Sequence, residues 1–393
     1  MKILCVSNTS FFLYNFARGL MKSLRDAGFQ VVAVAPHDPF SAKLEEERFR
    51  VVPLHQLDRK SSSPLDDARL LGELFQIYRR ERPDLVLQFT IKVNVYGSIA
   101  ARLAGTNSIC TVTGLGWLFT DKGLKARLGS LGYKALYKIA FSSSAHVVFL
   151  NRDDRAFFLK NRLVKNNDSS VIPGSGVNTE VFHPGLCEER NNNRALLADV
   201  PPSAASFLLI GRMLSDKGVR EFVEAAAIVK KSQPDAQFFL LGPMDKENRS
   251  AIPDEVIADW QHKGLVHYLG RTDDVRPFIC GSDVVVLPSY REGVPSSLLE
   301  AMAMGKPVIT TDAPGCREVV ENGKNGYTAP VKNAARLADC MFRFMELPRL
   351  EREAMGDYAR AKVLREFDEK IVTEAYLQLV KMHYARKTAS YVP

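Results

Sequence analysis

Short apolar runs rich in Val, Ile and Leu alternate along this chain with amphipathic stretches of about 12 to 18 residues. This alternation is typical of βαβ units, in which helices join parallel strands and cover both faces of a sheet. Such sheets bind ligands beyond the carboxyl ends of their strands. The chain is therefore predicted to be an α/β protein with its chemistry at a sheet edge.

The alternation stops once and then restarts, which divides the chain into two doubly wound halves. Residues 183–202 (HPGLCEERNNNRALLADVPP) are polar and bounded by prolines, as is typical of a linker. We expect a first domain over 1–183, a linker over 184–202, a second domain over 203–367 and a terminal helix within 368–393. The predicted strands are 2–7, 30–35, 50–52, 85–88, 108–112, 147–150, 170–172, 207–210, 237–241, 266–269, 283–287 and 308–310. The predicted helices include 13–26, 66–80, 93–104, 219–232 and 297–304.

Composition limits the class of protein. Apolar residues make up 46% of the 393 residues and charged residues 25%, an average composition for a soluble globular protein. The net charge of +8 favours an anionic partner, which could be a phosphate ligand, an acidic lipid or a nucleic acid. The six cysteines form no CxxC pair, so reduced thiols are expected. No apolar run approaches the ~20 residues that span a bilayer, and the first residues do not resemble a signal peptide, so we expect a cytoplasmic protein.

Two glutamates mark the most informative stretch, residues 287–305 (LPSYREGVPSSLLEAMAMG). Glu292 lies in a turn after a strand, and Ser297 and Glu300 open a helix in the S-x-x-E capping-box pattern. A carboxylate, free backbone N–H groups and a positive helix end would meet there, which suits a phosphorylated, hydroxyl-rich ligand. Two simpler interpretations stay open: Glu300 only caps its helix, and Glu292 forms a solvated surface pair with Arg291.

Two cations follow the first strand of the second half, in residues 208–218 (LLIGRMLSDKG). The strand ends at Gly211 and Arg212, and a tight turn then carries Lys217 to the start of a helix. A guanidinium fork and an ammonium point charge can share a diphosphate. Cations at a helix start oppose the helix dipole, so solvated surface residues are the alternative. A bound anion would remove that penalty, and we favour a phosphate site.

Together these segments resemble the retaining glycosyltransferases of family 4. Residues 211–222 (GRMLSDKGVREF) are similar to the family's G-R-x4-K-G segment, and residues 292–300 to its E-x7-E signature. Residues 172–184 (IPGSGVNTEVFHP) resemble the end of its first domain. The resemblance covers nearly the whole chain. It implies the GT-B fold, two Rossmann-like domains facing each other across a cleft, and a helix in 368–393 that packs back on the first domain.

The resemblance also implies a donor site. Arg212 and Lys217 would hold the diphosphate, Glu300 the ribose hydroxyls, and Glu292 the donor sugar. The implied catalytic residues are Arg212, Lys217 and Glu292, and the nucleobase would lie near 241–243 and 270–271. The whole implied donor site is Gly211, Arg212, Lys217, Leu241, Gly242, Pro243, Gly270, Arg271, Glu292, Gly293, Val294, Pro295, Ser296 and Glu300.

Within the family, the chain is most similar to bacterial enzymes that extend undecaprenyl-diphosphate-linked sugars, notably N-acetylgalactosaminyltransferases. Residues 89–105, 111–119 and 289–320 carry this likeness. The implied acceptor side consists of Asn8, Thr9, Ser10, Thr113, Gly114 and Gly116. Two features depart from the family: no Gly-Gly turn follows the first strand, and Thr113 stands where many members carry a histidine. A histidine-assisted mechanism is therefore not implied.

No D-x-D pair occurs in the sequence, although glycosyltransferases that need a divalent metal typically hold it through one. Two cations can neutralise the leaving diphosphate instead. We therefore expect no metal and no other cofactor.

Residues 122–141 (KGLKARLGSLGYKALYKIAF) combine basic side chains with an apolar stripe. This pattern is typical of a helix lying on anionic lipid, with Lys122, Lys125, Arg127 and Lys134 as the membrane contacts. An ordinary domain helix with a core face and a basic solvated face fits equally well. The first interpretation would place the protein peripherally on the cytoplasmic face of the inner membrane.

The function expected from sequence is transfer of a hexose or N-acetylhexosamine, N-acetylgalactosamine as the best guess, from a UDP-sugar to an undecaprenyl-diphosphate-linked sugar. A GT-B epimerase acting on a nucleotide sugar is one alternative. A nucleic-acid-binding protein is another, suggested by the positive charge, but the sequence shows no recognisable binding module, so no nucleic-acid partner is expected.

Overall fold

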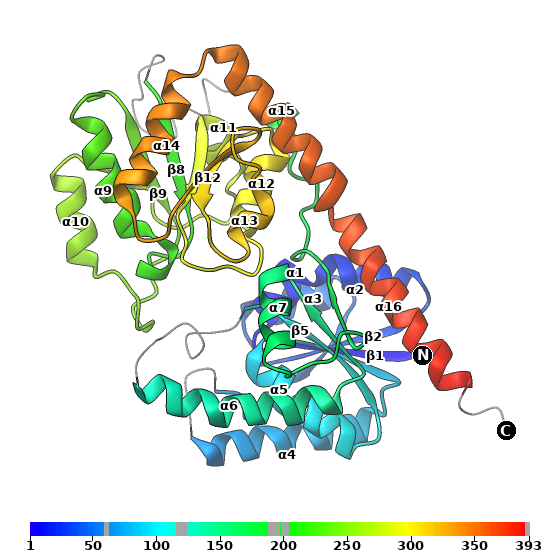
Figure 1. Cartoon of the computed structure of the whole chain (residues 1–393). Helices are drawn as coiled ribbons and strands as arrows, with labels where there is room; N and C mark the ends of the chain where they lie inside the picture. Colours follow the sequence, from blue (N-terminus) through cyan, green and yellow to red (C-terminus); the bar gives the residue numbers. More distant parts are fainter. Residues whose placement is uncertain (59–62, 115–123, 188–196, 198–203, 390–393) are drawn as a thin grey trace. The chain divides into compact units, whose positions relative to one another are not determined.

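The computed structural model describes residues 1–58, 63–114, 124–187, 197 and 204–389. The chain forms two compact units, Met1–Ser175 with Lys370–Pro393, and Gly176–Glu369 (Figure 1). The sequence pattern predicts the first boundary after residue 183 instead. Residues just after Gly176 belong to the second unit because Val177 donates a backbone hydrogen bond to Phe367 and accepts one from Glu369. Most of the expected linker lies outside the described residues, and its first part forms the short helix η2 (Pro184–Cys187).

The N-terminal unit is built on a seven-stranded sheet in the order β3-β2-β1-β4-β5-β6-β7. Every neighbouring pair is parallel, as the alternation predicts. The order reverses between β1 and β4, so the loops after these two strands leave the carboxyl edge at a topological switch point. The strands are β1 (Lys2–Val6), β2 (Gln30–Ala35), β3 (Arg50–Pro53), β4 (Leu85–Phe89), β5 (Asn107–Val112), β6 (His146–Phe149) and β7 (Ser169–Val171).

Helices cover both faces of this sheet (Figure 1). The single helix expected over 13–26 is two helices, because the backbone leaves helical geometry at Ala17 (φ −121°, ψ −3°). The helices are α1 (Ser10–Phe16), α2 (Arg18–Asp26), α3 (Pro39–Glu46), α4 (Pro64–Glu81), α5 (Ile91–Leu103), α6 (Leu124–Ser143), α7 (Arg152–Lys160) and α16 (Glu369–Ala389).

The last helix, α16, completes the core of the N-terminal unit. Val372, Tyr376 and Val380 are buried in one cluster with Ile3 and Cys5 of β1. The Tyr376 hydroxyl and Thr111 Oγ1 lie 2.9 Å apart and hydrogen-bond. The end of the chain is therefore part of the same core as its beginning.

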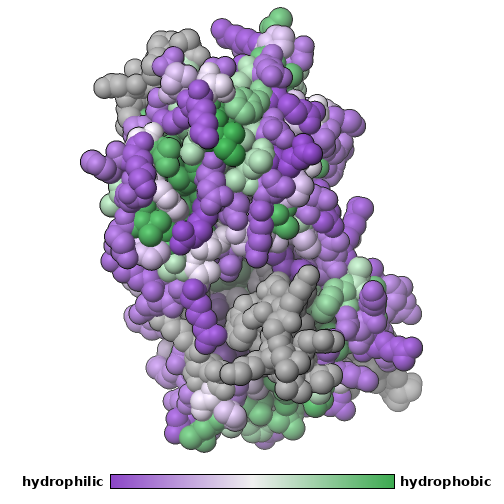
Figure 2. All heavy atoms as spheres, turned by 60° about the vertical axis from the view of Figure 1, so that its left-hand side comes forward, coloured by the Kyte–Doolittle hydropathy of each residue, from purple (hydrophilic) through white to green (hydrophobic). Residues whose placement is uncertain are grey.

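The C-terminal unit repeats the architecture with six parallel strands in the order β10-β9-β8-β11-β12-β13. The side that carries α9 and α10 exposes mainly hydrophilic side chains with hydrophobic areas between them (Figure 2). The strands are β8 (Ser206–Ile210), β9 (Gln237–Leu241), β10 (His267–Tyr268), β11 (Val284–Leu287), β12 (Val308–Thr311) and β13 (Gly326–Ala329). The helices are η3 (Ser215–Lys217), α9 (Val219–Lys230), α10 (Asp254–His262), α11 (Arg276–Gly281), α12 (Ser296–Ala303), α13 (Cys316–Val319), α14 (Ala334–Glu346) and α15 (Arg349–Glu366).

The expectation of six reduced cysteines is wrong for one pair. Cys187 of η2 and Cys280 of α11 form a disulfide with their Cα atoms 4.9 Å apart. The two residues are 93 positions apart in sequence, so no local spacing signals their contact. Cys5, Cys110 and Cys316 are free and buried.

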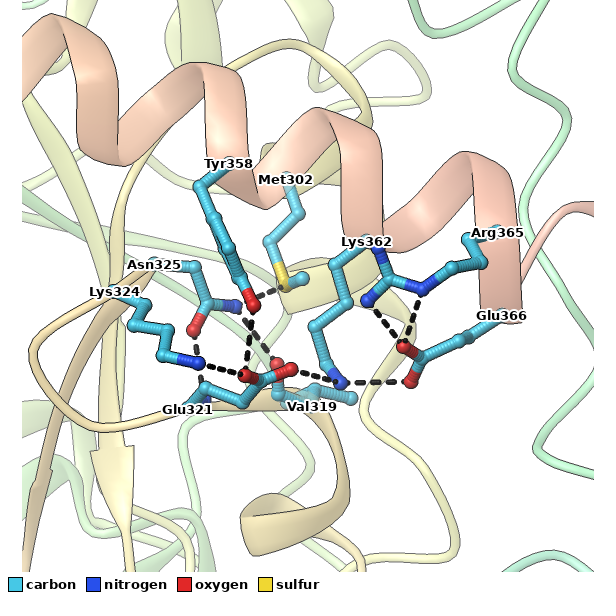
Figure 3. A network of polar contacts seen from close by, with 9 residues as sticks. All are labelled: Met302, Val319, Glu321, Lys324, Asn325, Tyr358, Lys362, Arg365 and Glu366. Carbon is cyan, nitrogen blue, oxygen red and sulfur yellow. Dashed lines mark hydrogen bonds and ion pairs between the residues drawn. The ribbon is translucent and has the colours of Figure 1, made fainter.

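A polar network attaches α15 to the loop after α13 (Figure 3). The Glu321 carboxylate accepts hydrogen bonds from the Tyr358 hydroxyl at 2.8 Å and from Lys362 Nζ at 3.0 Å. Lys362 Nζ also contacts Glu366 at 2.7 Å. Hydrogen bonds from Tyr358 and Lys362 lower the pKa of Glu321 to about 2.

We expect Glu321→Gln to lower the stability of the C-terminal unit by about 1–3 kcal/mol, because Lys362 would stay buried with one carboxylate fewer. For a unit of this size that corresponds to a melting temperature lower by roughly 2–4 °C per kcal/mol. Because the folded pKa of Glu321 is depressed, its contribution to stability is present above pH ~4.5 and is lost as the pH falls towards 2.

Calorimetry from pH 3 to pH 8 should therefore show the difference in melting temperature between variant and wild type becoming smaller in acid. Glu351→Gln, an exposed change on the same helix, is the matched control and should leave the melting temperature unchanged; a gap independent of pH would contradict the assignment.

Candidate functional site

The ends of β8 and β9 approach each other closely at the carboxyl edge of the second sheet. Gly211 donates its N–H to Leu241 O at 2.9 Å. A Cβ atom on Gly242, whose φ is +145°, would lie 1.9 Å from Gly211 O. Only glycine fits there, and the backbone after both strands is thereby held at the edge.

A tight turn then brings Lys217 to the end of β11. Gly218 follows Lys217 with φ +73°, and a Cβ on it would lie 2.1 Å from Pro288 O. The carbonyl of Asp216 accepts hydrogen bonds from Ser289 Oγ at 3.0 Å and from Tyr290 N at 2.9 Å. These contacts fasten the turn to the loop that carries Glu292.

Lys217 and Glu292 form the central ion pair of the site. Lys217 Nζ lies 2.5 Å from Glu292 Oε1, and only 22% and 13% of the two side chains are exposed. Little water therefore screens the pair. The far side of the loop is fixed as well, since Glu292 donates its N–H to Pro314 O at 3.0 Å, and a Cβ on Gly315 would lie 2.2 Å from Glu292 O. The interpretation of Glu292 as a solvated pair with Arg291 does not describe this arrangement.

Arg212 lies at the same edge but contacts a different carboxylate. Its Nη1 atom is 2.8 Å from Asp245 Oδ2, and both side chains are partly exposed. Asp245 follows β9 and was not identified as a site residue from the sequence. Its position just beyond the carboxyl end of a predicted strand is the one sequence feature that could have indicated it. The structure thus brings Lys217 to Glu292 and holds Arg212 in an exposed pair that a bound anion can compete for.

Glu300 lies on α12, within the first turns of the helix. The predicted capping box is wrong: the helix begins at Ser296 after Pro295, and no side chain caps it. The Glu300 carboxylate has no hydrogen-bond or ion-pair partner among the described residues. Surrounding protein removes water from this half-buried group and raises its pKa to about 7. It is available to accept hydrogen bonds from a ligand's hydroxyl groups.

Most of the remaining residues expected at the donor site contribute backbone atoms rather than side chains to this sheet edge. Leu241 is buried in the core, so its side chain cannot meet a base. Gly242 donates its N–H to Gly270 O at 2.8 Å, and Pro243 O accepts from Met213 N. The exposed Arg271 pairs with Asp273 at 3.2 Å. In the loop before α12, Val294 and Pro295 face the protein interior and Gly293 O lies close to Gly315.

The acceptor-side residues of the N-terminal unit follow β1 and β5. Thr9 caps α1, its hydroxyl accepting from Phe12 N at 3.1 Å. Ser10 is fully buried and hydrogen-bonds Pro36 O and Ser41 Oγ, so it fastens α1 rather than facing a ligand. Asn8, Thr113 and Gly114 are partly exposed at the edge. Gly116 lies outside the described residues.

Two polar residues missed by the sequence analysis lie at the switch point between β1 and β4. Thr90 follows β4 with φ +76°, a conformation that is costly for a β-branched residue. Thr90 Oγ1 and Ser7 Oγ are buried without a hydrogen-bond partner among the described residues. Strain and unsatisfied polar groups of this kind concentrate at functional sites. No local sequence pattern announces a positive φ at a threonine.

The expected membrane contacts are only partly described. Lys134 of α6 donates a hydrogen bond to Asn161 Oδ1 at 2.9 Å, so it is tied to the protein. Lys122 and the side chains of Lys125 and Arg127 lie outside the described part. Among the described helices, none has the length and apolar character needed to cross a membrane.

Two family models match the chain, one in each unit. Residues 15–174 match the model described as "Glycosyl transferase 4-like domain". Residues 204–346 match the model described as "Glycosyl transferases group 1". The first match lies in the N-terminal unit, which carries the expected acceptor-side residues, and the second lies in the C-terminal unit, which carries the expected donor-side residues.

Curated relatives extend over most of the chain. An N,N'-diacetylbacillosaminyl-diphospho-undecaprenol alpha-1,3-N-acetylgalactosaminyltransferase from Campylobacter jejuni is 31% identical over 96% of this chain and 98% of its own length. A UDP-Gal:alpha-D-GlcNAc-diphosphoundecaprenol alpha-1,3-galactosyltransferase from Escherichia coli is 28% identical over 72% of each chain.

Solved structures agree on the fold. A glycosyltransferase from Rickettsia africae superposes with a TM-score of 0.78 at 21% identity and 98% coverage of both chains. The HepE protein of Anabaena, in complex with UDP and glucose, gives a TM-score of 0.78 at 18% identity, covering 97% of this chain and 99% of that one. With two Rossmann-like parallel sheets and a relative that matches 96% of its length, this chain belongs to the family 4 glycosyltransferases of the GT-B fold and is a glycosyltransferase.

Proposed function

We propose that the protein transfers an N-acetylhexosamine, N-acetylgalactosamine in the first instance, from a UDP-sugar to an undecaprenyl-diphosphate-linked sugar. The observation that carries the proposal is the Lys217–Glu292 pair at the loop before α12, together with the unpartnered Glu300 carboxylate on α12 itself. The two relatives support the substrate classes, since their names refer to a transferred N-acetylgalactosamine or galactose and to acceptors linked to undecaprenol through a diphosphate.

We propose that the reaction retains the anomeric configuration. The acceptor hydroxyl would attack the anomeric carbon from the face that the diphosphate leaves. The bond from that carbon to the phosphate oxygen breaks, a bond to the acceptor oxygen forms, and the acceptor proton passes to the departing diphosphate. Lys217 and Arg212 would stabilise the negative charge that develops there, as preorganised donors do.

The two cations would supply the charge that a divalent metal supplies elsewhere, so we propose that turnover needs no metal. The acceptor is a lipid, so we propose that the protein works peripherally at an anionic membrane surface, with Lys122, Lys125 and Arg127 as the contact.

The test is a donor panel. Purified protein is incubated with UDP-N-acetylgalactosamine, UDP-N-acetylglucosamine, UDP-galactose and UDP-glucose, each with short-chain polyprenyl-diphosphate-linked sugars, and products are identified by mass and anomeric NMR. An α-linked product formed in excess EDTA supports the proposal. Loss of turnover in EDTA restored by Mn²⁺ would refute metal independence, and conversion of a UDP-sugar without any lengthened lipid product would favour the epimerase instead.

Donor affinity should depend on the ionisation of Glu300. Between pH ~4.5 and 7 the folded protein keeps this carboxyl largely protonated, because its pKa is raised to about 7. We expect the affinity for the UDP-sugar to rise as the pH increases through 7, since an ionised carboxylate accepts ribose hydroxyl bonds better. Glu300→Gln should bind roughly tenfold or more weakly at pH 8, the scale of hydrogen bonds to a charged group.

Titration calorimetry from pH 5.5 to pH 8.5 measures this dependence. A UDP-sugar is used rather than UDP because its diphosphate carries no group that titrates in this range. The Glu300→Gln profile should be flat. Parallel profiles for variant and wild type would exclude a ribose role for Glu300. In the absence of ligand the sign reverses: the raised pKa makes ionisation destabilising, so Glu300→Gln should gain stability relative to wild type as the pH rises from 4.5 to 7.

A further inference from the structure

The N-terminal unit contains a small cavity at the carboxyl edge of its sheet. Phe89, Thr111 and Leu150, at the ends of β4, β5 and β6, form one side. The other side comes from α1, α2 and α16. Its free volume of ≈ 20 Å³ has room for about one water-sized group. None of the residues expected to bind the donor lines it.

The inner wall of the cavity is apolar or already hydrogen-bonded. Phe89 and Val372 contribute apolar surface. Thr111 Oγ1 and the Tyr376 hydroxyl hydrogen-bond each other at 2.9 Å. Thr373 Oγ1 donates to Lys370 O at 3.1 Å. Each of these hydroxyls already has a hydrogen-bond partner, so an apolar group can enter the cavity without leaving any of them unpartnered. The cavity can therefore take a methyl group.

The outer part of the lining is partly exposed and has a different character. Phe12 and Phe16 of α1 lie there together with Thr113 and Ser175. The hydroxyls of Thr113 and Ser175 have no hydrogen-bond partner among the described residues. A ligand group that places a methyl inside and an amide at the two hydroxyls would use both parts of the lining. An acetamido group has this composition.

We propose that this cavity receives the methyl of an acetamido group on the lipid-linked acceptor sugar, with Thr113 and Ser175 facing its amide. The inference rests on the proposed function, in which the acceptor binds the N-terminal unit. The volume selects the group: one methyl fits, whereas an isoprene unit of the lipid does not. The cavity makes the enzyme discriminate between acceptor sugars that differ only in N-acetylation.

The test compares two short-chain polyprenyl-diphosphate acceptors that are identical except for an acetamido or a hydroxyl group at one sugar carbon. The donor is the one most active in the panel above. Wild type should prefer the acetamido acceptor by about tenfold or more in kcat/KM, the range for a methyl-sized group in an apolar pocket. Val372→Ile adds one methylene at the cavity wall and should abolish this preference without changing the affinity for UDP.

Val380→Ile is the matched control, the same change on the same helix and in the same core but away from the cavity. It should keep the preference. The melting temperatures of the two variants give a readout that does not depend on activity. Val372→Ile should keep or raise the melting temperature because it fills a void, whereas Val380→Ile should lower it by overpacking the core. Thr113→Val, which removes a hydroxyl but little volume, is a second variant and should reduce the preference as well.

The outcomes separate this inference from the proposed function. Equal use of both acceptors by wild type, or an undiminished preference in Val372→Ile, would overturn the acetamido site while leaving the transferase intact. If neither lipid-linked acceptor were lengthened, the proposed function itself would fail and the inference with it.

Discussion

Lys217→Ala should reduce turnover by at least ~10²-fold, the loss that follows removal of one preorganised oxyanion donor. The Lys217 side chain is only 22% exposed, and the turn closed by Gly218 against Pro288 holds its backbone in place. It therefore needs little reorganisation to meet charge on a leaving diphosphate. We expect the affinity for UDP to fall much less than turnover, because the charge on the diphosphate grows as the glycosidic bond breaks.

Single-turnover kinetics and UDP calorimetry together measure this split. Lys231→Ala removes an exposed lysine at the end of the following helix, α9, and serves as the control for charge alone; it should behave as wild type. Lys217→Ala with near-normal turnover would mean that Lys217 only stabilises the loop around Glu292. In that case the melting temperature would fall while the kinetics stayed intact.

The positions of the main charged residues could be predicted because they depend on sheet topology. Parallel strands present their carboxyl ends at one edge, and β8 and β11 are neighbours, so Lys217 and Glu292 had to come near each other once both loops were placed. The alternation of apolar and amphipathic segments recurs along the whole chain. It therefore predicts the order of strands and helices even where a boundary is wrong by a residue or two.

Features that depend on contacts between distant segments could not be predicted in the same way. Asp245 as the partner of Arg212 depends on how the β9 loop folds back. The start of α12 was misplaced because Pro295, with extended dihedrals, takes the N-cap position that S-x-x-E seemed to assign to a later residue. The cavity in the N-terminal unit joins Thr111 to Tyr376 across 265 residues, and no local pattern encodes its volume.

Glu292→Gln should move binding and catalysis in opposite directions. In the ligand-free protein Glu292 neutralises Lys217 at 2.5 Å, and with 13% of its side chain exposed its charge is little screened. A diphosphate must compete with this carboxylate for the lysine. Removing the negative charge should therefore tighten UDP binding by up to about tenfold, the effect of relieving one like-charge repulsion of ~1.4 kcal/mol.

Turnover should nevertheless fall by ~10²-fold or more, because the proposed role of Glu292 is to contact the donor sugar while the anomeric carbon becomes electron-poor, and a neutral amide stabilises that charge less. Calorimetry with UDP and steady-state kinetics with the full donor measure the two effects on one protein. Glu255→Gln, an exposed change on α10, controls for net charge and should alter neither quantity. Weaker UDP binding in Glu292→Gln would show instead that the carboxylate orients Lys217 for the diphosphate, so that the pair acts as one binding unit and the competition between ligand and glutamate does not occur.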